Sequence, residues 1–220
     1  IRQTESQIDP VIFPATVPGA IQEDLKKITR IDTTGLGWTY PTKASEDGLD
    51  MKTGLYLQHY KTASLPKRVA CMVSHMRTWQ ECINRNEPII VFEHDALVTN
   101  RFYKEDVLTR EFKGGIIGLN NPLGATRKAR VFLDKIVNRK GLHQVPTVDD
   151  INGPNLPQGL AGNSAYLITP TAAKKLLDKV REVGMWPNDA IMCKQFFPWL
   201  QVVYPFYTDI QKGLKSTTTK

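Results

Sequence analysis

Apolar side chains spaced three and four residues apart predict a long helix that begins at Pro66. Charged and amide side chains fall between them, so one face is apolar and the other polar. The apolar positions are Val69, Met72, Val73, Met76, Trp79, Cys82 and Ile83. A period close to 3.6 residues with one apolar stripe is typical of a helix half-buried in a core. Pro88 interrupts the pattern, because the residue before a proline disfavours the helical conformation.

The unbroken apolar run Ile89–Phe92 follows Pro88 and predicts a strand. Its residues are β-branched or aromatic and do not alternate with polar ones, which favours a central strand covered on both faces. The run stops at Glu93-His94-Asp95, and the two carboxylates of an extended Glu-x-Asp project to the same side. Ligands gather at the carboxyl ends of strands in open α/β sheets, so this acid pair is a candidate for chemistry.

Strands and helices alternate along the remainder of the chain. We expect a short strand or an extended segment at residues 10–15, strands at 115–119, 163–168 and 201–204, and helices at 18–30, 102–112, 170–183 and 186–197. Glycine and proline predict long loops at residues 31–61 and 145–160, and a polar tail occupies residues 212–220. This alternation predicts a single α/β domain over residues 1–220, an α/β/α sandwich with a mostly parallel central sheet.

The balance of charge favours an anionic partner. The chain has 29 basic and 22 acidic residues, a formal net charge of +7, which points toward a nucleotide, a nucleic acid or an anionic membrane surface. Six basic residues and one acid lie between Arg127 and Lys140, on a predicted helix or hairpin. This stretch is either a solvated basic face or a contact surface for phosphates.

The cysteines and the length of the apolar runs indicate the cellular compartment of the protein. Three cysteines in apolar or helical patterns do not suggest a disulfide framework, which favours a reducing compartment. No apolar run reaches the length of about 18 residues that spans a bilayer. We therefore expect a cytoplasmic protein, soluble or in peripheral contact with the inner face of an anionic membrane.

The acid pair suits a divalent cation. Mg²⁺ and Mn²⁺ bind carboxylate oxygens and keep open positions for phosphates, so Glu93 and Asp95 are candidate ligands, the alternative being a solvated strand end. His94 between them either points elsewhere or lends a nitrogen ligand. Asp189, at a predicted helix start, is either a partner of the helix dipole or a general base that faces the acid pair.

Several other chemistries are disfavoured. Ser74 lacks the glycines of a nucleophile elbow, and His75 beside it is expected to be a hydrogen-bonded structural residue. There is no Gly-x-Gly-x-x-Gly after a strand and no Walker-type loop, so dinucleotide and P-loop sites are not indicated. Cysteine and histidine are too sparse for a zinc site.

The motifs in this order resemble glycosyltransferase family 25. The central resemblance lies in Val69-Ala70-Cys71-Met72-Val73-Ser74-His75, Trp79-Gln80-Glu81 and Glu87-Pro88-Ile89-Ile90-Val91-Phe92-Glu93-His94-Asp95-Ala96. Further similar segments are Phe13-Pro14-Ala15, Gly162-Asn163-Ser164-Ala165-Tyr166-Leu167-Ile168, Pro187-Asn188-Asp189, Tyr204-Pro205, Gln211 and Ser216. The agreement is colinear from Phe13 to Ser216. His94 stands where the family has an aspartate, and the family's opening strand is not visible before Gln3.

The resemblance implies a GT-A fold and inverting transfer of a hexose from a nucleotide sugar, usually UDP-linked, to a hydroxyl. Glu93 and Asp95 would hold Mn²⁺ or Mg²⁺ and the donor diphosphate, with Asp95 the better metal ligand. Ala15 and Thr16 would line the nucleotide pocket, and Asp189 would be the base that deprotonates the acceptor. The metal would neutralise charge on the leaving diphosphate, while the base would activate the attacking oxygen.

The acceptor stays open at this point. A surface glycan such as lipooligosaccharide is the first hypothesis. The alternative is hydroxymethylated pyrimidine in phage DNA, motivated by the basic stretch with Lys212 and Lys215, which would place a phage-encoded enzyme in the host cytoplasm. His94 and the absent opening strand motivate a further alternative, a non-catalytic binding module on a degenerate transferase fold.

Overall fold

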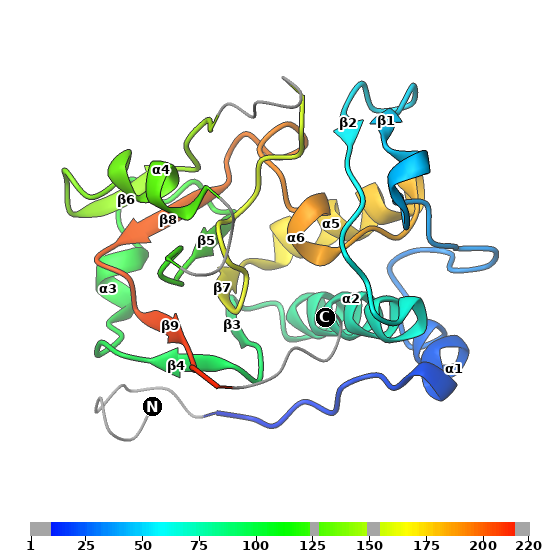
Figure 1. Ribbon diagram of the computed structural model, residues 1–220. Helices are drawn as coiled ribbons and strands as arrows, with labels where there is room; N and C mark the ends of the chain where they lie inside the picture. The colour runs from blue at the N-terminus through cyan, green and yellow to red at the C-terminus, as the bar shows by residue number, and fades with distance from the viewer. Residues whose placement is uncertain (1–9, 124–127, 149–154, 214–220) are drawn as a thin grey trace.

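Five strands form one mixed sheet at the centre of the computed structural model, which describes residues 10–123, 128–148 and 155–213 (Figure 1). The strand order is β3-β7-β5-β8-β6. The bounds are Ile89–Phe92 for β3, Ile116–Gly118 for β5, Gly141–Gln144 for β6, Ala165–Ile168 for β7 and Gln201–Tyr204 for β8. β7 is antiparallel to both of its neighbours, β5 and β8 are parallel, and β6 is antiparallel to β8.

The predicted α/β class is confirmed, but the mostly parallel sheet is wrong. Three of the four neighbouring strand pairs, β3 with β7, β5 with β7 and β6 with β8, are antiparallel. The predicted strand at residues 89–92 is also an edge strand of the sheet, not a central one, and its residues are only half-buried. The physical reason is that an unbroken apolar run reports cover on both faces and carries no information on strand direction.

Both faces of the sheet are covered. Helices α2 (Leu65–Arg85) and α5 (Pro170–Val183) pack against one another on one side, and Tyr166 and Ile168 of β7 join their core (Figure 1). On the other side a smaller core includes Ala165 and Leu167 with Val107 of helix α3 (Lys104–Val107). Ala96 of strand β4 (Ala96–Val98), which pairs with β9 (Thr208–Ile210), packs against this core. The alternation along β7 therefore divides its side chains between two cores.

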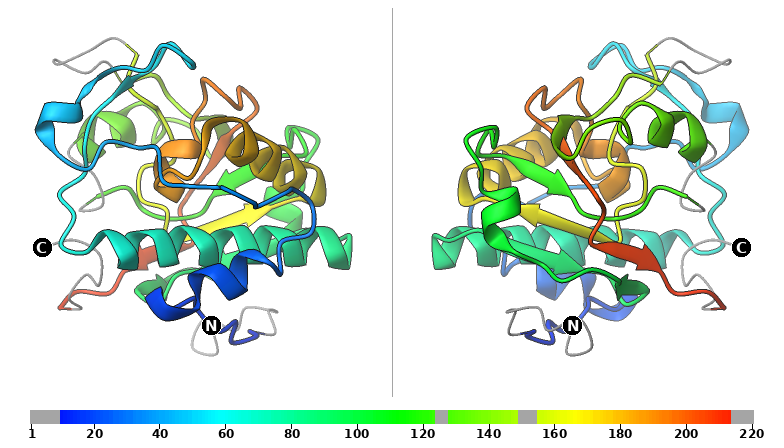
Figure 2. Two further views of the ribbon diagram at one scale, coloured as in Figure 1. Left: turned by 90° about the vertical axis from the view of Figure 1, so that its right-hand side faces the viewer. Right: turned by 90° about the vertical axis from the view of Figure 1, so that its left-hand side faces the viewer.

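The predicted helix from Pro66 is confirmed as α2. Pro66 lies in its first turn, where the missing N–H costs no hydrogen bond. The helix ends at Arg85, and Asn86 caps it with a left-handed φ of 52°. The apolar stripe is buried as expected at Met72, Val73, Met76, Trp79 and Cys82. Figure 2 shows the short helix α1 (Ile21–Leu25) lying along α2, which it contacts.

Three other helices are shorter than the sequence pattern predicts. Residues 18–30 form only a turn of 3₁₀ helix, η2 (Pro18–Ala20), and α1; residues 102–112 form α3; residues 186–197 form α6 (Asn188–Ile191). Beyond α6, the backbone of Cys193 forms an isolated antiparallel β-bridge with that of Gly159, and Lys194 N donates to Gln158 O at 2.8 Å. These tertiary pairings take the backbone groups that a longer helix would have used. Residues 10–15 are irregular and exposed.

The first of the two predicted loops contains short elements. Residues 31–61 hold η3 (Ala44–Glu46) and the hairpin of β1 (Gly48–Leu49) and β2 (Tyr56–Leu57), after which the chain descends past α6 to α2 (Figure 1). The stretch expected as a helix or hairpin contains α4 (Ala129–Asp134). No helix among the described residues is long and apolar enough to cross a membrane.

Candidate active site

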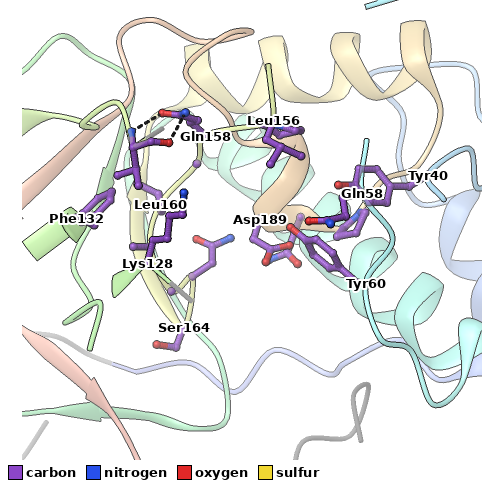
Figure 3. A pocket seen from close by; sticks show the side chains of 18 of the residues that line it. Tyr40, Gln58, Tyr60, Lys128, Phe132, Leu156, Gln158, Leu160, Ser164 and Asp189 are labelled. Atoms are coloured by element: carbon purple, nitrogen blue, oxygen red, sulfur yellow. Dashed lines mark hydrogen bonds between the residues drawn. The ribbon is translucent and has the colours of Figure 1, made fainter. Parts of the chain in front are cut away.

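A cavity of about 830 Å³ opens where the end of β3, the turn before β7, α6 and the segment after β2 meet. That volume is in the range of small-molecule sites. Figure 3 shows Asp189, Tyr60 and Gln58 on one side of it, Lys128 and Phe132 on the other, and Ser164 below them. The two long loops expected from the sequence thus supply walls of the cavity.

Glu93 and Asp95 both line the cavity, whereas His94 between them is exposed and is not among the lining residues. The extended geometry expected for Glu-x-Asp is wrong. The strand ends at Phe92 and the chain turns, with Ala96 N donating to Glu93 O at 3.1 Å. A turn of this kind still brings both carboxylates to the cavity and leaves the middle residue outside.

Glu93 is held by a network from three other segments. Its Oε1 lies 3.2 Å from His75 Nε2 and 3.4 Å from Asn188 Nδ2. His75 Nδ1 in turn lies 2.8 Å from the Tyr166 hydroxyl, which also accepts from Trp79 Nε1 at 2.9 Å. A carboxylate with these partners is fixed in orientation.

The pairing changes the protonation of both groups. Burial alone would raise the pKa of Glu93, but the hydrogen bond and charge of His75 outweigh it and lower the pKa. Burial opposes a charged imidazole, yet contacts with Tyr166, Cys71 and Glu93 hold the pKa of His75 well above its usual value. His75 was predicted to be a hydrogen-bonded structural residue; it is hydrogen-bonded, and its partner is one of the two candidate acids.

Asp189 lies in the first turn of α6 and lines the same cavity. Burial raises its pKa; the positive charge of Arg68 opposes that shift, and Glu93 adds to it. A carboxylate with a raised pKa is a stronger base near neutral pH. The structure therefore brings Asp189 to the same cavity as the acid pair.

Ala15 and Thr16 are not among the residues that line the cavity. Ala15 is exposed. Thr16 is buried, its N–H donates to Ser74 Oγ at 2.9 Å and its hydroxyl donates to Asp24 Oδ2 at 2.7 Å. Arg77 Nη1 also donates to Asp24 Oδ2, at 3.0 Å. Through Ser74 and Arg77, these hydrogen bonds hold the segment around Thr16 and helix α1 against α2.

Four residues that line the cavity have buried polar atoms without a hydrogen-bond partner in the described part of the chain. The atoms are Arg68 Nε, Asp95 Oδ1, both amide atoms of Asn163 and Ser164 Oγ. Buried polar groups are almost always paired, so unpaired ones require an explanation. The sequence analysis missed Arg68, Asn163 and Ser164. The available signal for Asn163 and Ser164 was a small polar pair at the start of the strand predicted at residues 163–168, which begins at Ala165 in the structure.

The donor set fits a divalent cation held by few protein ligands. The described residues contain no group of three or more acidic, histidine or cysteine side chains able to hold a metal. Mg²⁺ at phosphate sites is commonly bound by one or two carboxylates and completed by phosphate oxygens and water. Asp95, with an unpaired buried oxygen, suits that role, while Glu93 already contacts His75.

The predicted basic stretch has mixed surroundings. Lys128 lines the cavity. Arg130 pairs with Asp134 at 3.1 Å, Lys135 donates to the Thr147 carbonyl, and Arg139 donates to the Leu142 carbonyl at 3.2 Å. Arg127 lies outside the described residues. Much of the charge between residues 128 and 140 is therefore engaged locally or directed at the cavity.

Comparison with known proteins identifies the class of enzyme. The sequence model of the family described as "Glycosyltransferase family 25 (LPS biosynthesis protein)" matches residues 50–192. This range contains Glu93, Asp95, Asn163, Ser164 and Asp189, and excludes Ala15 and Thr16. The protein is a glycosyltransferase, and the chain belongs to glycosyltransferase family 25. No curated protein matches the chain.

Proposed function

We propose that the protein is a metal-dependent, inverting glycosyltransferase that moves a hexose from a UDP-linked donor to a hydroxyl of a lipopolysaccharide-type surface glycan. The observation that carries the proposal is that Asp95 and Asp189 line one cavity in a chain of glycosyltransferase family 25. Asp95 has an unpaired buried oxygen, and the pKa of Asp189 is raised. The two carboxylates therefore suit different tasks.

At the donor end, Asp95 would hold Mn²⁺ or Mg²⁺ and the diphosphate, and Glu93, oriented by His75, would assist it. When bound, the cation neutralises charge that develops on the departing diphosphate. Arg68 and Lys128 line the same cavity and add positive charge around the phosphates. The GT-A-like donor site of this proposal is built on the mixed sheet described above.

At the acceptor end, Asp189 takes the proton of the attacking hydroxyl. The acceptor oxygen forms its bond to the anomeric carbon while the bond from that carbon to the diphosphate oxygen breaks. One in-line displacement inverts the configuration of the sugar. Because the base must be ionised, turnover should be lost as pH falls through the raised pKa of Asp189.

The replacement Asp189→Asn tests this assignment. We expect UDP affinity to stay within about twofold while turnover falls by a factor of about 10² to 10⁴, the usual range for loss of a general base. Calorimetry with UDP and Mn²⁺ measures the first quantity, and release of UDP from UDP-hexose with a glycan acceptor measures the second.

Asp178→Asn is a matched control, because Asp178 is exposed and pairs with Arg30 on the surface. It should leave both quantities unchanged. Full turnover by Asp189→Asn would remove Asp189 from the role of base. Loss of UDP binding by that variant would instead place Asp189 at the donor end.

A further inference from the structure

Asn163 and Ser164 are buried polar residues whose side chains have no partner among the described residues. Asn163 is 8% exposed and Ser164 is 5% exposed. Both amide atoms of Asn163 and the hydroxyl of Ser164 are unpaired. A buried polar group left unpaired destabilises the folded protein, because it has lost its hydrogen bonds to water. Three such atoms on one wall of a cavity indicate a polar ligand that pairs with them.

The sheet places these two residues beside the acid pair. In the antiparallel pairing of β3 with β7, Phe92 is opposite Ala165, and Glu93 N donates to Ser164 O at 2.7 Å. Ser164 is therefore opposite Glu93, and Asn163 is the next residue outward along the same edge. Gly162, with a φ of 76°, turns the chain immediately before them. Both residues line the cavity together with Asp95.

The chemistry of the unpaired atoms selects among the parts of a nucleotide sugar. The Asn163 amide presents one acceptor and two N–H donors, and the Ser164 hydroxyl can do both. A phosphate only accepts hydrogen bonds, so it would leave Asn163 Oδ1 unpaired. Neighbouring sugar hydroxyls both donate and accept, and they match the amide and the hydroxyl together.

Position separates the sugar from the uracil ring, which also has donor and acceptor atoms. In a nucleotide sugar the hexose is bonded directly to the distal phosphate, whereas the base is separated from the diphosphate by the ribose. Asn163 and Ser164 are beside Glu93 and Asp95, to which the diphosphate is assigned. The ribose is also bonded to the diphosphate, but the hexose is the group that must meet the proposed base Asp189, whose neighbour Asn188 contacts Glu93 at 3.4 Å. We therefore assign Asn163 and Ser164 to the hexose.

We propose that Asn163 and Ser164 bind hydroxyl groups of the transferred sugar and determine which hexose the enzyme accepts. The inference rests on the proposed function, since it requires a nucleotide-sugar donor. Sites built to hydrogen-bond a substrate hydroxyl discriminate strongly against analogues that lack it, because their polar groups are then left unpaired. The two residues are specificity determinants and take no part in proton transfer.

Asn163→Ala and Ser164→Ala test the proposal with UDP-glucose, UDP-galactose and UDP-N-acetylglucosamine as probes. For each variant we expect UDP affinity in Mn²⁺ within about twofold of the wild type. The value of kcat/KM for the preferred sugar should fall by about tenfold or more, and discrimination among the three sugars should shrink by a similar factor. Ser164→Ala should unfold at an equal or higher temperature, because it removes an unpaired buried hydroxyl.

Ser45→Ala is the matched control, because Ser45 is exposed and is not among the lining residues. Unchanged selectivity in both variants, in an enzyme whose wild type is selective, would overturn the sugar subsite and leave the proposed function intact. Equal loss of UDP and UDP-hexose affinity would also overturn it, by assigning the residues to the nucleotide. If the wild type binds no nucleotide sugar, the proposed function fails and the subsite with it. If Asn163→Ala does not fold, the selectivity of Ser164→Ala among the three UDP-sugars tests the proposal.

Discussion

Asp95 and Glu93 are two residues apart, yet their carboxylates have different surroundings. Glu93 Oε1 is 3.2 Å from His75 Nε2, whereas Asp95 Oδ1 is buried without a partner among the described residues. An oxygen that already contacts an imidazole gains less from a cation than an unpaired one. Asp95 is therefore the first candidate for the metal ligand.

We expect Asp95→Asn to lose the contribution of Mn²⁺ to donor binding. Wild-type affinity for UDP should rise with Mn²⁺, and in the variant this gain should shrink by about tenfold, since a neutral amide is a poor ligand for a hard cation. Titration of UDP with Mn²⁺ or with EDTA measures the gain. Asp178→Asn again provides the surface control, and an undiminished gain in Asp95→Asn would show that other groups hold the cation.

Whether a site residue can be recognised from the sequence depends on how far apart along the chain its contacts lie. The Glu93-x-Asp95 pair is visible because it ends an apolar run, but the partners of His75 lie 18, 91 and 113 positions away along the chain. Asn163 and Ser164 were missed for a related reason. A polar pair before a strand is ordinary, and only the fold shows that both side chains are buried and unpaired.

Among the elements, the segment that contains Gly159 and helix α6 approach each other so closely that only glycine fits. A Cβ on Gly159 would be 2.5 Å from Asp189 O and 2.7 Å from Met192 O, both backbone atoms. Gly159 also forms a bridge with Cys193. This contact sets the position of α6, and hence of Asp189, against the cavity wall.

Gly159→Ala should therefore reduce stability and activity together. We expect a loss of about 1–3 kcal/mol in the free energy of unfolding, as for other overpacked sites, and a fall in kcat larger than any change in UDP affinity, because α6 carries the proposed base. Urea unfolding and UDP release measure the two effects. Gly19→Ala is the control, since a Cβ at Gly19 meets no atom within 4 Å. Wild-type kcat in Gly159→Ala would show that this contact does not position Asp189.

Element type was more predictable than element direction or length. Apolar runs located β3, β5, β7 and β8, and the helices expected from Pro66 and at residues 170–183 are α2 and α5. Strand direction was not predictable, because sheets covered on both faces have apolar runs whether their strands are parallel or antiparallel. Helix α6 is short because the chain after it pairs with residues 158 and 159. A pairing between segments this far apart in the chain cannot be predicted from a local sequence pattern.

In the whole molecule, the basic residues behind the net charge of +7 include two groups in different surroundings. Arg68, Lys61 and Lys128 line the cavity, where positive charge suits a diphosphate. In the stretch that motivated a DNA acceptor, Arg130, Lys135 and Arg139 contact neighbouring protein groups. The basic residues at the cavity support a nucleotide-sugar donor. The protein contacts of the other group weaken the case for a broad phosphate-binding surface.

The salt dependence of binding to duplex DNA distinguishes the two acceptors. Each phosphate neutralised contributes about −0.9 to the slope of log K against log salt. With three or fewer such contacts, affinity should fall by less than about 50-fold between 50 and 200 mM salt. We expect this shallow dependence, together with transfer to a lipopolysaccharide-type glycan that added DNA does not alter. Replacing Arg130 and Arg139 together by alanine should leave that transfer unchanged. A steep slope, with hexose appearing on duplexes that contain hydroxymethylated pyrimidine, would move the acceptor from glycan to DNA while leaving the donor site as described.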